Sequence, residues 1–286
     1  FIDSVGAKDF QSAFSTVTET DPILLNNPIS VDMGFMRPSL LPGLVQSAMT
    51  NFSKGQKHVR VFECGNIFVS GEGGEREEKM VVSAFISGVQ ENNVWEQTGK
   101  SYDYYDLKGT LSAVSRLLKL KLIEHPEPEN PFMFKGRSVG LTVDGKACGY
   151  LGELSPSIIR QYELPKHCIV FELDFDRLMC ALPKQVRFLN LPKFPEIYRD
   201  ISILIDKTVP SGEVIDRINQ VGGPLLRKVE LYDHFEGNKI KEGEKSLTYA
   251  LTFQSSDRTL IDEEVNPVFE KIVKILSSQL GAMLRE

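Results

Sequence analysis

The chain has 286 residues, of which 41% are hydrophobic and 25% are charged, and its formal net charge is −6 at pH 7. This composition is close to that of average soluble globular proteins and excludes the disordered and fibrous classes. The length is enough for two domains, each with its own core. The negative charge argues against a non-specific nucleic-acid coat, which binds by neutralising phosphates, but is compatible with a protein that reads unstacked bases.

Targeting and redox features point to the cytoplasm. No stretch approaches the about 20 consecutive apolar residues that cross a bilayer. The start, Phe1-Ile2-Asp3, has no initiator methionine, basic segment or long apolar run, so we expect a cut from a longer chain and no signal peptide. The cysteines are widely spaced, without a Cys-x-x-Cys pair, so we expect free thiols and no metal site.

The first part of the chain predicts helices and a mixed or antiparallel sheet. Apolar residues recur at helical spacing over 40–52, behind Ser39, which can cap a helix. A second helix is predicted from Asp106 to about Leu118, and we interpret the acids at Asp103 and Asp106 as a helix-start cap in preference to an acid/base cluster. The remaining predicted elements are strands at 59–63, 80–88, 138–143, 146–151 and 168–173, a hairpin turn at 143–146 and a short helix at 155–162.

A domain boundary is predicted near Pro192 and Pro195, which lie between two β-rich stretches. The predicted domains are therefore 1–190 and 194–286. In the second, the order βαββαβ is the ferredoxin-like, split-βαβ pattern, so the whole chain is predicted to be α+β. Its predicted elements are strands at 200–205, 228–235 and 246–254, helices from Ser211 to Gly222 and from about Asp262, and a short last strand near Leu284. Pro267 fits a helix interior poorly, which leaves a start one or two residues later open.

Strand alternation separates two faces of this second sheet. In the strand at 246–254 the apolar residues alternate toward the helices, which leaves Ser246 on the open face, and the same pattern leaves Ser202 there. Leu231 has the same parity as Asp233 and Phe235, so the pattern does not decide the face of that strand. If Asp233 and Phe235 join the two serines, the open face suits a splayed base. An ordinary solvated sheet face is the alternative.

Four segments of the second domain carry a resemblance: 194–200, 231–237, 243–247 and 258–265. They resemble the ferredoxin-like anticodon-binding domain at the C-terminus of the bacterial phenylalanyl-tRNA synthetase β chain. The resemblance implies that the open face holds the anticodon of tRNA(Phe), stacked on Phe235, where relatives often carry Tyr. It also implies polar contacts from Asp233, Ser246 and Ser202.

Three lysines lie in and beside the loop between the second and third strands of this domain. They are Lys239, Lys241 and Lys245. A lysine ammonium neutralises a phosphate, so we interpret these residues as possible phosphate contacts.

The first domain continues the resemblance at 27–30, 36–44, 60–65 and 105–109. These segments resemble the family's catalytic-like core, a class II synthetase fold that has lost activity. Glu63 stands where an active class II site needs an Arg for ATP, and an acid there repels a triphosphate. Glu172 and Asp174 replace glycines that would allow the nucleotide close approach. We therefore expect no catalytic residue, cofactor or metal in this chain.

The resulting hypothesis is a non-catalytic part of the phenylalanine–tRNA ligase β chain. The resemblance implies a cytoplasmic (αβ)₂ assembly in which the holoenzyme uses ATP and magnesium, and we expect the helix at 37–52 and its sheet to contact the catalytic α chain. An active synthetase domain with its own ATP site is one alternative, against which Glu63 counts. An amino-acid-binding regulatory module is the other, because ferredoxin-like domains also bind small effectors.

Overall fold

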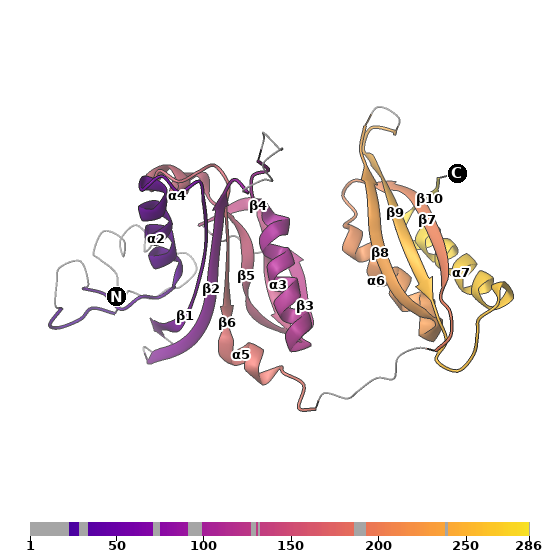
Figure 1. Cartoon of the computed structure of the whole chain (residues 1–286), viewed down its shortest axis with the longest axis horizontal. Coiled ribbons are helices and arrows are strands. Elements are labelled where there is room, and N and C mark those ends of the chain that lie inside the picture. Colours follow the sequence, from indigo (N-terminus) through magenta and orange to yellow (C-terminus); the bar gives the residue numbers. More distant parts are fainter. Residues whose placement is uncertain are drawn as a thin grey trace. The chain divides into compact units, whose positions relative to one another are not determined.

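The structure is a computed structural model, and it describes residues 23–28, 34–70, 75–90, 99–126, 130, 132–185, 193–237 and 240–285. The chain forms two compact units, Phe1–Val186 and Arg187–Glu286, each with its own sheet (Figure 1). The predicted bounds 1–190 and 194–286 stay a prediction, because the segment around them lies outside the described residues. Among the described helices, none is both long and apolar enough to span a membrane.

Unit 1 contains a six-stranded sheet in the order β1-β2-β6-β5-β4-β3, and each neighbouring pair is antiparallel. The strands are β1 (His58–Ser70), β2 (Arg76–Gly88), β3 (Leu122–Pro126), β4 (Met133–Val143), β5 (Lys146–Leu154) and β6 (Cys168–Asp174). Five of them lie where the sequence predicts strands. The sequence does not predict β3, which is short, ends in a proline and is mostly exposed. The turn between β4 and β5 has positive φ at both Asp144 and Gly145, as a tight hairpin requires.

Helices cover both faces of this sheet. They are α2 (Leu41–Ser53), α3 (Tyr104–Leu118), α4 (Pro156–Gln161) and α5 (Phe175–Cys180). Helices α2 and α4 share one core with β1 and β2, whereas α3 and α5 share the core on the other face (Figure 1). Asp103 caps α3, because its carboxylate accepts from two backbone N–H groups while Asp106 accepts from the Asp103 N–H. The cap interpretation is therefore confirmed.

The helix α2 does not present its apolar stripe to a partner. Four of its apolar residues are buried in the core of unit 1, and only Met49 among its large apolar side chains is classed as exposed. The sheet beneath the helix therefore takes up this stripe, and the expected contact of the helix at 37–52 and its sheet with another chain stays a prediction.

The start of α2 is held by the buried carboxylate of Glu172 on β6. Its Oε2 accepts hydrogen bonds from Ser83 Oγ at 2.6 Å, Leu40 N at 2.9 Å and Ser39 Oγ at 3.0 Å. Its Oε1 accepts from the Tyr150 hydroxyl at 3.4 Å. Leu40 occupies the N-cap position, so the predicted cap Ser39 acts from one residue earlier, where its Oγ accepts the first N–H of α2. Burial raises the pKa of Glu172, although all four donors oppose the rise.

Unit 2 contains a four-stranded antiparallel sheet in the order β10-β7-β9-β8. Its elements are β7 (Ile197–Asp206), α6 (Ser211–Gly222), the 3₁₀ helix η3 (Gly223–Leu225), β8 (Leu226–Phe235), β9 (Glu244–Phe253), α7 (Asp262–Leu280) and β10 (Met283–Leu284). The predicted βαββαβ order is confirmed. Both helices pack on the same face of the sheet through one apolar core (Figure 1).

The last helix begins at Asp262, and Pro267 lies inside it. The later start that the proline left open is therefore wrong. Three acids in the first turn favour the helix N-terminus, and the Ile261 N–H donates to Glu264 Oε2 at 3.3 Å. Burial of Val265 and the apolar residues that follow it on the same face outweighs the one hydrogen bond that a proline removes.

Candidate nucleic-acid interface

The open face of unit 2 is the side of the sheet that α6 and α7 leave uncovered. On β8 the pairing with β9 shifts at Tyr232. Leu231 pairs with Tyr249 and Asp233 pairs with Thr248, so Tyr232 is an extra residue without a partner on β9. Such a β-bulge reverses the face to which the following side chains point. Leu231 therefore points with Tyr249 toward the helices, whereas Asp233 and Phe235 point to the open face. This bulge resolves the ambiguity that the parity of the three residues left.

Cross-strand pairs place the four predicted contact residues in two adjacent rows of this face. In one row Ser202 pairs with Thr248, which pairs in turn with Asp233. In the next row Ser246 pairs with Phe235. Directly paired residues share a face, with their Cβ atoms about 4.5–5.5 Å apart. The Ser202 and Thr248 hydroxyls are 2.9 Å apart, so the first row is also joined by a hydrogen bond.

The four side chains differ in their exposure to solvent. Asp233 is exposed and the ring of Phe235 is 39% exposed, whereas Ser202 is half-buried and Ser246 is only 2% exposed. Arg285 covers Ser246, because its Nη1 donates to Ser246 Oγ at 3.0 Å. The backbone N–H of Arg285 donates to the Ser202 carbonyl at 2.9 Å, which continues the pairing of β10 with β7. Sequence reasoning missed Arg285, since only the sheet order brings it beside β7.

Two further aromatic side chains lie on the same face. Tyr198 pairs with Thr252 and is 64% exposed. Tyr232, at the bulge, is 59% exposed. Desolvation and a hydrogen bond with Asp200 raise the pKa of the Tyr232 hydroxyl, so this ring reaches from β8 across the central strand to β7. With Phe235, three aromatic rings therefore lie along the open face.

The three predicted lysines do not form one group. Lys239 lies outside the described residues, and Lys241 is exposed in the loop between β8 and β9. Lys245 pairs with Ile205, so its side chain starts on the face of the helices, and its Nζ donates to the Lys207 carbonyl at 3.0 Å. The structure therefore does not bring Lys245 to the face that carries Phe235.

In unit 1, the residues compared with nucleotide-binding positions are engaged by the protein itself. Glu63 pairs with Arg37 at 2.6 Å. Asp174 accepts from the Arg177 backbone N–H at 2.9 Å and caps α5, and the Arg177 guanidinium binds the Ala147 carbonyl. These side chains stabilise local structure.

Two family models match the chain. The "Phenylalanyl tRNA synthetase beta chain CLM domain" matches residues 1–175, and the "Ferredoxin-fold anticodon binding domain" matches residues 192–285. A pyrrolysyl-tRNA synthetase structure from Desulfitobacterium hafniense aligns with a TM-score of 0.43 and 14% identity over 62% of this chain and 56% of that chain, which is too weak to support an argument.

Curated relatives are similar over nearly the whole chain. Three of them are named "Phenylalanine--tRNA ligase beta subunit". The proteins from Moorella thermoacetica and Vibrio cholerae are each 35% identical to this chain, and the matches cover 92% and 94% of this chain and 33% and 34% of the relatives. The protein from Geobacillus kaustophilus is 31% identical, and the match covers 99% of this chain and 35% of the relative. The chain thus spans about a third of the length of these relatives. It belongs to the phenylalanyl-tRNA synthetase β-chain family, with a ferredoxin-fold anticodon-binding domain in its second unit.

Proposed function

We propose that unit 2 binds the anticodon of tRNA(Phe) on its open face, as part of a phenylalanine–tRNA ligase that uses ATP to join phenylalanine to this tRNA. The observation that carries the proposal is the register at the β8 bulge, which turns Phe235 and Asp233 to the same face as Ser202. An exposed ring beside hydrogen-bonding groups is the arrangement by which proteins read unstacked bases.

Each side chain has a separate role in this proposal. The Phe235 ring stacks on one anticodon base, while Asp233 accepts hydrogen bonds from the edge of a base and Ser202 offers a hydroxyl. Ser246 is too deeply buried to meet a base directly. It acts by holding the Arg285 guanidinium, which is exposed and available to a base edge or a phosphate.

Substitutions of the polar residues test base reading. Asp233→Asn and Ser246→Ala are expected to weaken tRNA binding by about 1 kcal/mol each and to reduce discrimination among anticodons while the stack remains. The first variant changes an acceptor that faces a base edge, and the second releases the Arg285 guanidinium that Ser246 holds. Affinities for tRNA(Phe) and an anticodon-substituted tRNA are measured for each variant. Ser277→Ala is the control for Ser246→Ala, because it removes an exposed hydroxyl from α7. A uniform loss for both tRNAs would contradict base reading by Asp233 and by the Arg285 guanidinium that Ser246 holds.

Salt dependence tests the phosphate contacts. Lys241→Ala is expected to lower the slope of log affinity against log salt by about one unit, without changing anticodon preference, if Lys241 neutralises one phosphate. Lys245→Ala is the matched control and is expected to leave the slope unchanged, because its ammonium binds the Lys207 carbonyl away from Phe235. The reverse result would show that Lys245 makes the phosphate contact. Lys239 is tested in the same series.

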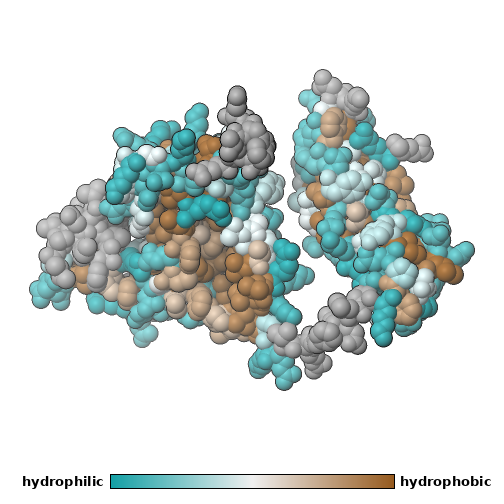
Figure 2. Space-filling model, viewed as in Figure 1, coloured by the Kyte–Doolittle hydropathy of each residue, from teal (hydrophilic) through white to brown (hydrophobic). Residues whose placement is uncertain are grey.

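For unit 1 we propose a class II synthetase-like core without catalytic groups that pairs with the catalytic α chain. The pairing of Glu63 with Arg37 and the capping by Asp174 support a structural role for the positions at which an active site would hold ATP. Exposed apolar side chains on α3 and β3 support a partner surface; they are Val114, Leu117, Leu118 and Ile123. Brown surface gathers over the C-terminal half of α3 in Figure 2.

The assembly in this proposal is a cytoplasmic (αβ)₂ heterotetramer. In it the α chains carry the reaction, which consumes ATP and requires magnesium, and this chain contributes the pairing surface and the anticodon face. The whole proposal is tested by purifying the chain with its α subunit and comparing affinities for tRNA(Phe) and for the same tRNA with a substituted anticodon. Equal affinities for both tRNAs would overturn anticodon reading, and failure to co-purify would overturn the pairing.

A further inference from the structure

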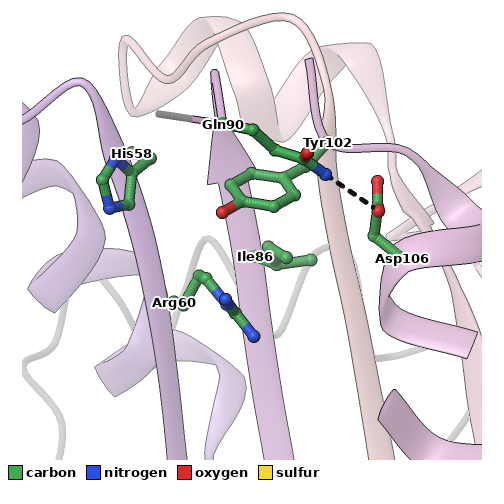
Figure 3. A pocket seen from close by; sticks show the side chains of 6 residues that line it. All are labelled: His58, Arg60, Ile86, Gln90, Tyr102 and Asp106. Atoms are coloured by element: carbon green, nitrogen blue, oxygen red, sulfur yellow. Dashed lines mark hydrogen bonds between the residues drawn. The ribbon is translucent and has the colours of Figure 1, made fainter. Parts of the chain in front are cut away.

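Unit 1 contains a polar pocket that the proposed function does not use. It lies where the end of β2 and the start of β1 meet the N-terminus of α3, and its volume is about 340 Å³. Six residues line it: His58, Arg60, Ile86, Gln90, Tyr102 and Asp106 (Figure 3). This volume is at the lower end of the about 300–1,000 Å³ that is usual for ligand sites, so it suits a small metabolite.

One side of the pocket gathers groups that can bind an anion. Among the described residues Arg60 has no ion-pair partner, and its guanidinium carbon lies 5.8 Å from the centre of the Tyr102 ring. Figure 3 shows the Tyr102 hydroxyl pointing between Arg60 and His58. The Nδ1 atom of His58 is buried without a hydrogen-bond partner in the described part of the chain. This nitrogen has almost no accessible surface, so it lies beneath the wall of the pocket and out of reach of a ligand there.

The acid in the pocket does not balance Arg60. Asp106 Oδ1 accepts from Gln90 Nε2 at 3.0 Å, and Oδ2 accepts from the Asp103 backbone N–H at 2.8 Å as part of the α3 cap. Its negative charge is therefore directed at the positive end of the helix. Arg60 remains the uncompensated charge, and the pocket beside it is mainly polar because Ile86 and Tyr102 are both buried.

We propose that this pocket binds a small organic carboxylate. The Arg60 guanidinium presents a planar pair of donors that matches a carboxylate, and the Tyr102 hydroxyl adds a hydrogen bond. The hydrocarbon part of the ligand lies toward the open side of the pocket, because Ile86 and Tyr102 are buried and leave it little surface. One guanidinium balances one negative charge, so a monocarboxylate suits this pocket better than inorganic phosphate, which carries more than one negative charge at neutral pH.

The experiment titrates benzoate and inorganic phosphate into the whole 286-residue chain by calorimetry and by ligand-observed NMR. Saturable benzoate binding is expected in the wild type, and Arg60→Gln is expected to weaken it by about tenfold or more, the scale of one charge-assisted hydrogen bond. Tyr102→Phe, which keeps the ring, is expected to weaken it by a few-fold. Bound benzoate also raises the unfolding temperature of the wild type.

Arg116→Gln is the matched control, because Arg116 is an exposed arginine on α3 that does not line the pocket. It is expected to bind benzoate as the wild type does. Arg60 is exposed as well, so unchanged unfolding of Arg60→Gln is expected and separates lost binding from lost folding. The proposal is overturned if the wild type shows no saturable binding, if Arg60→Gln binds equally well, if Arg116→Gln loses as much, or if phosphate binds more tightly than benzoate.

Discussion

Replacing Glu172 with alanine is expected to lower the free energy of unfolding by about 3–5 kcal/mol, because each buried donor left without an acceptor costs about 1–3 kcal/mol. The carboxylate accepts from two hydroxyls, one phenol and the backbone N–H at the start of α2. Its loss also leaves a cavity between β6 and that helix. Urea unfolding of unit 1 measures the effect. Glu75→Ala, which changes an exposed acid just before β2, is expected to change stability by less than about 0.5 kcal/mol.

The conservative variant Glu172→Gln separates hydrogen bonding from charge. Burial raises the pKa of Glu172 above its ordinary value of 4.5, so the folded state holds the proton more tightly than the unfolded state does. The free energy of unfolding is then highest below the ordinary pKa and falls as the pH rises through the raised value. Glutamine keeps an acceptor oxygen without a charge, so this variant is expected to lose much less stability than alanine and to lack that pH dependence. Equal losses for both variants would contradict the account based on desolvation.

Elements with a clear period were predictable from the sequence, and side-chain contacts across the sheets were not. The stripe of α2, the alternation of β9 and the Asp144-Gly145 turn each indicate an element through local chemistry. Glu172 is different, because its four donors come from segments scattered along the chain and only the fold brings them together. The resemblance to a class II core interprets this acid as the replacement of a glycine that would allow a nucleotide close approach, whereas its burial shows a structural role.

In the candidate interface too, the sequence predicts the strands and their faces but not the side-chain contacts between strands. Alternation correctly places Ser202 and Ser246 on the open face, but it cannot show that Ser246 is covered. Arg285 reaches Ser246 because β10 pairs with β7, and the two residues lie 39 positions apart in the chain. Simple parity also fails at β8, where one extra residue at Tyr232 turns Asp233 to the other side. A bulge leaves no reliable mark in a single sequence, so the most important feature of the site required the structure.

Removing the ring of Phe235 is expected to weaken binding of tRNA(Phe) by about 1–3 kcal/mol, the usual scale of one base–aromatic stack. Stacking uses the face of the ring and no polar atom, so Phe235→Tyr is expected to be nearly neutral. The variants are measured in the assembly with the α chain, by equilibrium binding of tRNA(Phe) and of the same tRNA with a substituted anticodon. Phe62→Ala is the matched control, because it removes an equally large and more exposed ring from unit 1.

The anticodon-substituted tRNA makes this test specific. A stack tolerates different bases, so Phe235→Ala is expected to reduce affinity for both tRNAs, whereas Asp233→Asn reduces mainly the difference between them. Unchanged affinity for tRNA(Phe) in Phe235→Ala, with unfolding like that of the wild type, would exclude stacking at this ring. Equal affinities for the two tRNAs in wild type and variant alike would instead exclude anticodon reading on this face, and pairing of unit 1 with the α chain would remain to be judged by co-purification alone.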